Sequence, residues 1–534
     1  MFTEFKTAAK MERKGGSGKG EERQQRLCGS GAFGFPRAVA DTTITASPGP
    51  ADNRFPPQVK YIVGNEACER FSYYGMKSIL ALYITTVLLK TKDQATTIIH
   101  LFGFANYFMP LLGAWVSDRF WGRYNTILWI SLFYCAGHGV LATSDLFGVE
   151  GKVYCLYAGL ALIAFGSGGI KPCVSAFVGD QFKPTQSHLL QKAYGAFYFS
   201  INFGSFFSFL VIPRLAREAS YAWAFGVPGI LMAVATLIFW LGTKHYVRRP
   251  PSRETRTAGF LEVFVHAATA ARGPGDRGFW APARRTFSAA EIDAAASVLP
   301  ILGVFALIPP FWSLFEQSNS TWVLQGEKMV PVPLTGMAAT LLGWLFGKEI
   351  SAEQMQSTNP MLVMILVPLL TLAVYPWLRR WVTPLRRIAA GMFVTAVSYV
   401  IVGYLQQRIE AGDKLSILWQ IVPYVVLTLA EVLVSTTGLE FAYSQAAPTM
   451  KSTIMGFWLL TVAIGNLLVS AVTAFAGGGN HEASVTSGRF FFYAGLVAVV
   501  AVLFMGVAML YRYRDQTSAA AHAAADNQRP AGGS

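Results

Sequence analysis

The sequence NEACERFSYYGMK, residues 65–77, carries four charged side chains and runs directly into the apolar stretch SILALYITTVLL, residues 78–89. On a helix, spacings of three and four place its polar side chains on one face: Glu66, Glu69, Arg70, Tyr73, Tyr74 and Lys77. This stripe is about eleven residues, or roughly 16 Å, long, which is more than a helix end needs to snorkel to water. Because ionisable residues at such depth usually line a cavity, we expect the stripe to face away from lipid.

The composition is that of a protein with many membrane spans. Of 534 residues, 53% are hydrophobic and 14% are charged, whereas soluble domains carry roughly 25% charged residues. The mean hydropathy is +0.39. The net charge of +14 is spread over loops between apolar blocks, which favours a membrane orientation signal over nucleic-acid binding. The five cysteines form no CxxC pair and lie mostly in or beside apolar blocks, so we expect neither a metal site nor disulfides.

Twelve apolar segments are predicted to be helices, because backbone polar groups cannot stay unpaired in lipid. They span residues 59–89, 95–117, 124–145, 152–178, 190–213, 221–243, 297–325, 353–377, 384–407, 415–438, 451–475 and 488–511. The predicted fold is therefore an all-α membrane protein with twelve transmembrane helices in two six-helix bundles. Two such halves joined by a cytoplasmic loop form a known transporter plan, with the substrate site between the halves near mid-membrane.

The same pattern divides the chain into five regions. We expect a disordered N-terminal extension at 1–52 and a disordered C-terminal tail at 513–534. Between them lie an N-terminal six-helix bundle at 53–243, a basic cytoplasmic linker at 244–296 and a C-terminal six-helix bundle at 297–512. The linker and the loop between segments eight and nine hold most loop arginines. Both termini are therefore expected in the cytoplasm, with the chain spanning the cell (inner) membrane.

Two shorter apolar stretches are not counted as spans. GFLEVFVHAATAA, residues 259–271, contains Glu262 and His266 and is too short to cross, so it predicts a surface or amphipathic helix. Residues 330–351 include LTGMAATLLGWLF, which is also too short. We expect this second stretch to be an extracellular loop that folds over the outer end.

Several motifs resemble those of a known family. GAWVSDRFWGR, residues 113–123, resembles the conformational loop of the major facilitator superfamily, whose matching positions here are Gly113, Asp118, Arg119, Gly122 and Arg123. The opening stretch resembles the ExxERFxYYG motif of the proton-dependent oligopeptide transporter family. Further matches are FYFSINFGSF (197–206), FWSLFEQSNSTW (311–322), GSGGIKP (166–172) and LAEVLVSTTG (429–438). The resemblance is collinear over roughly residues 55–512, which makes chance a poor explanation.

The resemblance implies a proton-coupled symporter that imports di- and tripeptides by alternating access. It implies peptides, protons and the lipid bilayer as partners, no cofactor beyond the coupling proton, and a monomer. Two alternatives remain open from the sequence. One is the same fold carrying another solute, such as nitrate or a drug-like molecule. The other is a channel or a membrane enzyme, although no GxSxG or HExxH motif is present.

The resemblance also assigns roles to residues. Proton coupling and gating fall to Glu66, Glu69, Arg70, His100, Lys171 and Glu316. Peptide binding falls to Tyr74, Lys77, Tyr107, Lys171, Tyr198, Asn202, Trp312, Asn359, Glu431, Ser435 and Trp458. Lys77 stands where the family usually has arginine, so it keeps the charge but lacks the bidentate fork. We expect Glu316 to pair with Lys77 at the outer gate and Glu431 to pair with Lys171 towards the inner gate.

Some of these roles have plain structural alternatives. His100 is a lone histidine, and such a residue is more often simply hydrogen-bonded; its unperturbed pKa near 6.5 also suits proton coupling. Trp312 and Trp458 are equally well explained by packing. Lys171 and Glu431, by contrast, lie in apolar surroundings where an ionisable group is costly. A carboxyl group away from water takes up a proton more readily, and a nearby cation opposes this, which is the balance that a proton-coupled switch needs.

Overall fold

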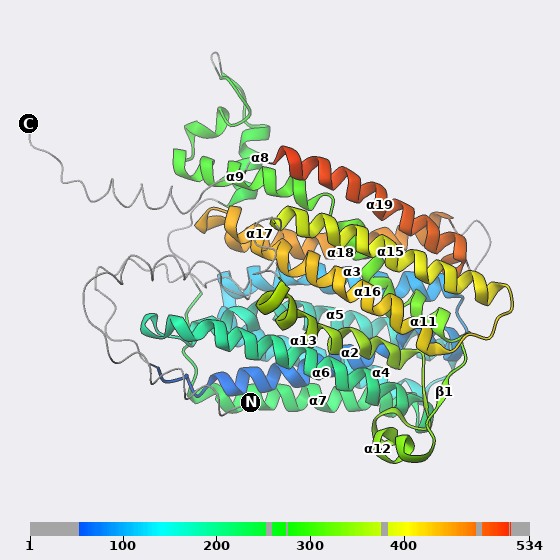
Figure 1. The fold of residues 1–534 in the computed structure, drawn as a ribbon. Helices are drawn as coiled ribbons and strands as arrows, with labels where there is room; N and C mark the ends of the chain where they lie inside the picture. Colours follow the sequence, from blue (N-terminus) through cyan, green and yellow to red (C-terminus); the bar gives the residue numbers. More distant parts are fainter. Residues whose placement is uncertain are drawn as a thin grey trace, which may run out of the picture.

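Helices form nearly all of the described chain in this computed structural model (Figure 1). The structure describes residues 53–251, 259–273, 276–374, 383–476, 483–511 and 513. The predicted extension at 1–52 lies outside these residues, as does the predicted tail at 513–534 apart from residue 513.

The first half of the chain contains α2 to α7. Helix α2 (Val59–Leu82) continues into a π-helical turn, η3 (Tyr83–Val87). Helix α3 (Lys92–Val116) is followed by the π-helical turn η4 (Ser117–Trp121) and α4 (Gly122–Ala142). The remaining long helices of this half are α5 (Val149–Asp180), α6 (Leu190–Glu218) and α7 (Tyr221–Leu241).

The second half is more interrupted. It begins with α9 (Ala289–Phe305), α10 (Pro309–Glu316), η9 (Gln317–Asn319) and α11 (Thr321–Gly326). It continues with η10 (Glu353–Ser357), α13 (Thr358–Leu369), η11 (Leu370–Val374) and α15 (Pro384–Glu410). It ends with η12 (Ile417–Gln420), α16 (Ile421–Glu431), the π-helical turn η13 (Val432–Thr436), α17 (Thr437–Gln445), α18 (Lys451–Ala476) and α19 (Ser487–Leu510).

Within the described residues, each of the twelve predicted segments coincides with one helix or with a run of consecutive helical elements, so the prediction that these segments are helical is confirmed. The seventh segment differs from the prediction of a single span at 297–325. It starts earlier, at Ala289, and bends by 49° between Phe305 and Pro309. Pro309 and Pro310 explain the break, because proline lacks the backbone N–H and disfavours helix in the residue before it.

Within the described residues, nine helical stretches are long and apolar enough to cross a membrane, or ten if the bent pair counts as one span. One of the nine, Lys92–Leu146, has 55 residues, far more than the roughly 20 that one crossing needs. Gly122 interrupts this stretch with a φ of 72°, which favours glycine. Helix α2 is not among the nine, because its charged stripe lowers its hydropathy.

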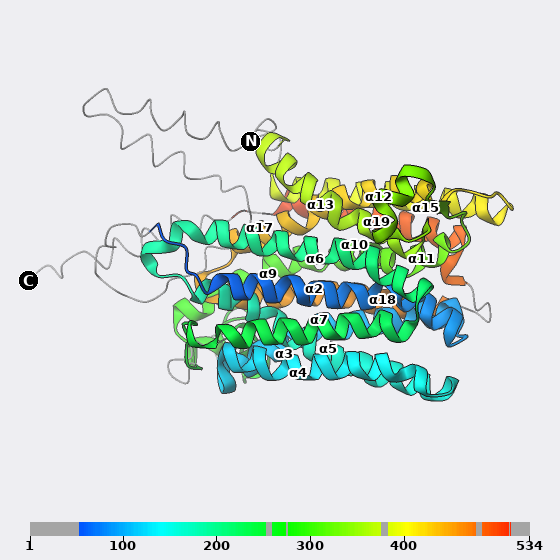
Figure 2. The ribbon, with the colours of Figure 1, turned by 90° about the horizontal axis from the view of Figure 1, so that it is seen from below.

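The long helices lie side by side in both views, with α2 packed against α6 and α7 (Figures 1 and 2). In the first half α4 and α3 also pack on α5; in the second half α15 packs on α16 and α19, and α10 on α18. The halves meet mainly where α3 contacts α18 and where α6 contacts α13. We call the end at which α6 passes into α7 the outer end, and the opposite end, near α8 (Phe260–Thr269), the inner end.

Both short apolar stretches form structure. The predicted surface helix is α8 (Phe260–Thr269), and its Phe260 ring lies 5.6 Å from that of Phe457 on α18. The stretch at 330–351 is more than the loop that we expected. It contains an antiparallel pair, β1 (Val332–Pro333) and β2 (Glu349–Ile350), which encloses the eleven-residue helix α12 (Gly336–Phe346). The strand pair joins the chain segments that lead into and out of α12.

Glycine contacts set how closely α2 and α6 approach. A Cβ atom at Gly204 on α6 would lie 2.4 Å from the Ala67 carbonyl oxygen of α2, which is closer than real contacts allow. Gly195 on the same helix has open space around its Cβ position. We therefore predict that Gly204→Ala lowers the stability by about 1–3 kcal/mol, measured as a lower melting temperature in detergent. The matched control Gly195→Ala should leave the melting temperature unchanged or raise it; equal effects of the two would contradict the close contact.

Candidate functional site

The charged stripe of α2 is buried, as its spacing predicts. Glu66, Glu69 and Lys77 are each 2% exposed, and Arg70 is the least buried of the four. The Arg70 guanidinium lies 2.6 Å from Glu66 and 3.1 Å from Glu69, so one cation serves two carboxylates. Ser167 on α5 donates a hydrogen bond of 3.4 Å to Glu69. The inner part of the stripe therefore carries one more carboxylate than cations.

Lys77 forms the predicted ion pair with Glu316. Its Nζ lies 2.7 Å from Oε2 of Glu316, and both side chains are almost fully buried. The pair links α2 of the first half to the C-terminal end of α10 in the second half. Breaking a buried pair leaves an uncompensated charge, which usually costs about 3–5 kcal/mol. The two halves are therefore linked by charges that tolerate burial only as a pair.

His100 is a second tie at the same level. Its Nδ1 lies 2.9 Å from Oδ1 of Asn466 on α18, and its Nε2 lies 2.9 Å from Oγ of Ser320. The Asn466 amide nitrogen donates to the Val462 carbonyl, so its oxygen is left to accept from His100. Gly103 makes room, because a Cβ atom there would lie 2.4 Å from the same oxygen. The arrangement fixes the His100 ring between the two halves.

Lys171 has no carboxylate partner at ion-pair distance among the described residues. Its Nζ lies 3.5 Å from Oδ1 of Asn106 and sits 4.2 Å from the ring centre of Tyr73 and 5.2 Å from that of Tyr107. These are neutral acceptors and π faces, which stabilise an ammonium group less than a carboxylate does. The lysine is half-buried, so part of its charge remains available.

Glu431 is likewise held by neutral groups. Its Oε2 accepts a 2.7 Å hydrogen bond from the Asn359 amide, which also donates to Thr428 at 3.1 Å. The predicted pair of Glu431 with Lys171 is wrong for this conformation, because each group has other partners. The reason lies in the fold: Lys171 is on α5 and Glu431 ends α16, so they belong to different halves, and the ties between the halves gather at the outer end.

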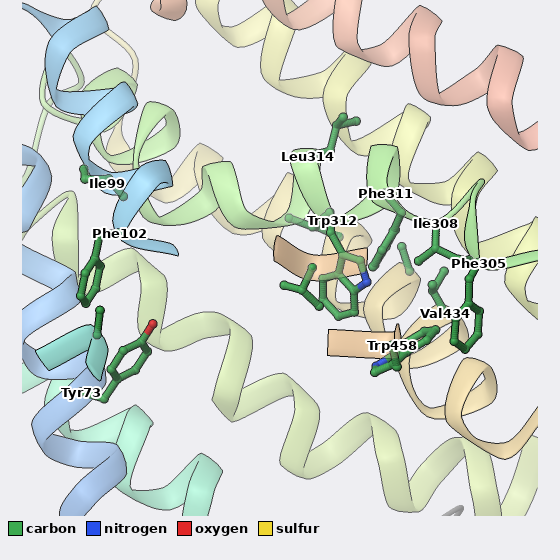
Figure 3. Packing of buried hydrophobic residues seen from close by; sticks show 14 of the residues in the cluster. Tyr73, Ile99, Phe102, Phe305, Ile308, Phe311, Trp312, Leu314, Val434 and Trp458 are labelled. Atoms are coloured by element: carbon green, nitrogen blue, oxygen red, sulfur yellow. The ribbon is translucent and has the colours of Figure 1, made fainter. Parts of the chain in front are cut away.

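The predicted aromatic and amide residues divide between the halves. The ring centroids of Trp312 and Trp458 lie 6.0 Å apart, with the rings edge to face (Figure 3). The Tyr73 ring stacks on that of Phe102 with a centroid distance of 6.3 Å. Tyr74 contacts the ring of Phe209 at 5.6 Å. The Asn202 amide bonds within its own helix to the Tyr198 carbonyl at 3.0 Å, and Ser435 lies in the π-helical turn η13. The buried Trp312 indole N–H lacks a hydrogen-bond partner in the described structure, which leaves it free to donate to a ligand.

The conformational loop lies at the inner end. Gly113 allows α3 to approach α5 closely, since a Cβ there would lie 2.3 Å from the Gly169 carbonyl oxygen. Arg123 forms a 2.6 Å ion pair with Asp180 at the end of α5, and Arg249 approaches the same carboxylate at 3.3 Å. Asp118 and Arg119 lie exposed in η4. The loop is thus fastened within the first half by Asp180.

A charge cluster closes the outer end. Arg217 of α6 reaches three carboxylates of the second half: Glu353 at 2.8 Å, Glu327 at 3.6 Å and Glu349 at 3.7 Å. Glu353 is only 2% exposed at its side chain. Burial raises the pKa of the Glu327 carboxyl, and the neighbouring Glu353 charge raises it further. Nearby, the Gln356 amide donates to the Ser78 carbonyl at 3.2 Å. The structure is therefore closed at the outer end.

Sequence reasoning missed the partners of several site residues: Tyr73, Asn106, Ser167, Asp180, Ser320, Asn466, and the cluster of Arg217 with Glu353. A signal exists for some of them. Asn106 and Asn466 are lone amides in apolar segments, where an unpaired polar group is costly. Tyr73 lies on the recognised stripe. Arg217 and Glu353 look like ordinary loop charges in the sequence, and only the fold brings them together.

The comparison with known families decides the identity of the chain. The family model described as the POT family matches residues 124–485. The chain belongs to the POT family. This confirms the resemblance drawn from the motifs.

Relatives and solved structures of the POT family agree. Peptide transporter 3 of Caenorhabditis elegans is 27% identical over 671 residues, covering 86% of this chain and 93% of the relative. Solute carrier family 15 member 1 of Homo sapiens is 33% identical over 387 residues, covering 67% of this chain and 52% of the relative. The crystal structure of the POT family transporter PepTSo is 42% identical with a TM-score of 0.77, covering 86% of this chain and 99% of that one. The crystal structure of an auto-inhibited POT family peptide transporter is 38% identical with a TM-score of 0.77, covering 89% of this chain and 99% of that one.

The outer cluster yields a prediction for this POT-family member. Glu353→Gln removes the shortest ion pair of Arg217 and should weaken outer closure by about 1–2 kcal/mol, since the half-exposed arginine is screened by solvent. Spin labels at Glu150→Cys and Lys414→Cys, in a variant whose native cysteines are replaced, report the opening as a longer distance in double electron–electron resonance.

Glu218→Gln is the matched control, because Glu218 pairs with Arg214 within α6. Its distance distribution should match that of the unaltered protein. An unchanged distribution in Glu353→Gln would show that Arg217 does not hold the outer end closed.

Proposed function

We propose that this chain is a proton-coupled symporter that imports di- and tripeptides by alternating access, with twelve membrane-spanning helices in two six-helix bundles. Relatives named as peptide transporters support the substrate class. The family fold supports the two bundles. The contacts at the outer end, from Lys77, His100 and Arg217, support a state closed on that side.

One observation carries the peptide assignment: a cation and a carboxylate lie on different halves, and neither has a partner of opposite charge at ion-pair distance within the described part of the chain. Among the described residues, the groups that hold Lys171 and Glu431 are neutral. A peptide has a carboxylate at one end and an ammonium at the other, so it supplies both missing partners. Lys171, together with Lys77, binds the carboxylate, and Glu431 binds the amino group. Nitrate would need no partner like Glu431.

Fixed charges on two halves also select for length. A single amino acid carries its ammonium and carboxylate groups on the same carbon, so it does not reach both Lys171 and Glu431. A long peptide exceeds the space between these two residues. The polar groups around them bind backbone atoms rather than side chains: Tyr74, Tyr107, Tyr198, Asn202 and Ser435. The Trp312 indole N–H adds a donor for a peptide carbonyl. Side-chain selectivity is therefore loose.

Proton coupling follows from carboxylates that compete for few cations. Arg70 pairs with both Glu66 and Glu69. One of these two carboxylates therefore accepts a proton while the other keeps its ion pair with Arg70. Protonation of Glu316 has a larger effect, because it removes the partner of Lys77 and with it the tie between α2 and α10. Lys77 is then free to bind the peptide carboxylate. His100 takes part through its hydrogen bonds to the other half.

We place the protein in the cell membrane as a monomer with both termini in the cytoplasm. Both halves that supply the site come from one chain, so a second copy is not required for binding. The basic linker at the inner end supports the orientation, because positive loops stay on the cytoplasmic side.

Uptake into liposomes tests the function. Purified protein should accumulate dialanine when an inward proton gradient is imposed, and accumulation should stop when a protonophore removes the gradient. Glu316→Gln, which cannot change charge, should lose gradient-driven accumulation while still exchanging labelled for unlabelled peptide.

Asp293→Asn, on an exposed face of α9, is the control and should transport normally. Failure to accumulate any of a panel of short peptides would overturn the substrate assignment. Intact gradient-driven uptake by Glu316→Gln would remove Glu316 from proton coupling.

Binding of the amino terminus is tested at Glu431. Glu431→Gln should weaken binding of dialanine roughly tenfold to a hundredfold, since a hydrogen bond to a charged group contributes about 1.5–3 kcal/mol. The same change should alter binding of N-acetyl-dialanine much less, because that peptide lacks the ammonium group. The affinity of each peptide is measured by its competition with uptake of a labelled peptide. The unaltered protein and the exposed-site control Glu150→Gln give the reference affinities. An equal loss for both peptides would contradict this contact.

A further inference from the structure

Helix α12 is apolar on almost every side and yet stands outside the protein. Its sequence, GMAATLLGWLF, has no charged residue. Met337 is 78% exposed, Leu341 61% and Trp344 62%, and Leu345 is the only residue of the helix that is buried. Apart from the Trp344 indole, Thr340 carries its only polar side chain, and that hydroxyl bonds back to the Gly336 carbonyl at 3.4 Å. A helix that is apolar all round is normally buried. In water, α12 would expose its apolar side chains on several sides.

The helix is placed firmly at the outer end. The Trp344 carbonyl accepts from the Arg214 guanidinium of α6, and the Phe346 carbonyl accepts from the Gln354 amide at 3.0 Å. The same Gln354 amide donates to the Leu210 carbonyl of α6 at 2.9 Å. Figure 1 shows α12 projecting sideways from the long helices, near the ends of α6 and α7. It therefore lies at the flank of the molecule and not within the stack of long helices.

Length and connection rule out a crossing. Eleven residues span roughly 16 Å as a helix, about half of a hydrocarbon core of roughly 30 Å. The chain also enters and leaves on the same side, because β1 and β2 pair next to each other, Val332 with Ile350 and Pro333 with Glu349. The charged residues Lys348 and Glu349 follow at the base of the helix.

Exposed side chains at the outer end indicate where the lipid interface lies. Trp223 at the start of α7 is 59% exposed, and Trp419 in η12 is 57% exposed; both are at the outer end. Exposed tryptophans at helix ends mark the level of the headgroups. Trp344 of α12 is exposed at this same end, and farther along α7 the exposed side chains, such as Ile230 at 57%, are apolar. The surface beside α12 is thus the lipid-facing surface of the helices.

We propose that α12 is a re-entrant helix embedded in the lipid leaflet at the outer end, where acyl chains cover Met337, Leu341 and Trp344. Lipid is the only medium on this face that matches an uncharged helix exposed on several sides. The helix is bonded to α6 through Arg214 and to η10 through Gln354, so it fastens both halves of the outer closure to the bilayer. The embedding follows from the outer-end geometry and does not require that the chain transports peptides.

Site-directed spin labelling tests the embedding. Leu341→Cys is labelled in the cysteine-replaced protein, reconstituted into phosphatidylethanolamine–phosphatidylglycerol vesicles. Collision with oxygen, which concentrates in lipid, is compared with collision with a water-soluble nickel chelate. The label at 341 should resemble one at Ile230→Cys on the lipid-facing side of α7. It should differ from one at Lys348→Cys, which is exposed at the base of α12.

Two outcomes overturn the proposal. Nickel accessibility at 341 equal to that at 348 would place α12 in water, and a discrete label-to-label distance between copies at 341 would show that a second copy covers it. If the cysteine-replaced protein does not fold, quenching by brominated phospholipid replaces the labels. The quenching lost in Trp344→Phe, relative to the unaltered protein, then measures the contact with lipid; no loss would also overturn the proposal.

Discussion

The buried ion pair between Lys77 and Glu316 is the interaction on which the arrangement of the two halves depends. Both side chains are withdrawn from water, so each needs the other, and the pair joins α2 to α10. Apolar packing holds helices together whatever the protonation state. A buried pair is different, because neutralising one partner leaves the other charge buried without its partner. The halves are thus joined at the outer end by a contact that a proton can release.

The rest of the site complements this tie. While Lys77 is satisfied by Glu316, Lys171 and Glu431 remain half-buried with only neutral partners. Charge is therefore unbalanced locally on each half, and in the proposed function a zwitterionic peptide restores the balance on both. Protonation of Glu316 would neutralise its carboxylate and leave the positive charge of Lys77 on α2 without a partner. In the proposed function, proton and peptide act on the same small set of charges, so that binding of one changes the free energy of binding the other.

Much of the fold and part of the site follow from the sequence. Apolar segments predict the helices, and spacing predicts the buried stripe of α2, because both signals are local. The bend before Pro309 is local as well, but its position within an apolar run hides it. The partners are not local: Asn466 is 366 positions from His100, and Glu353 is 136 positions from Arg217. No spacing rule connects such residues. The prediction that Lys171 pairs with Glu431 failed because opposite charges alone do not reveal which conformation brings them together.

Helix α2 combines a fixed side and a switching side. Gly204 and Gly75 let α6 and α2 touch almost backbone to backbone, with the Gly75 position facing Ile212 and Ser208 of α6. Such close packing leaves no room for α2 to slide within its own half. Its charged face, in contrast, meets the second half through the ion pair of Lys77 with Glu316, a contact that protonation changes. Any opening at the outer end must therefore separate α10 and α18 from α2 and α3 as units, which is the motion that alternating access requires.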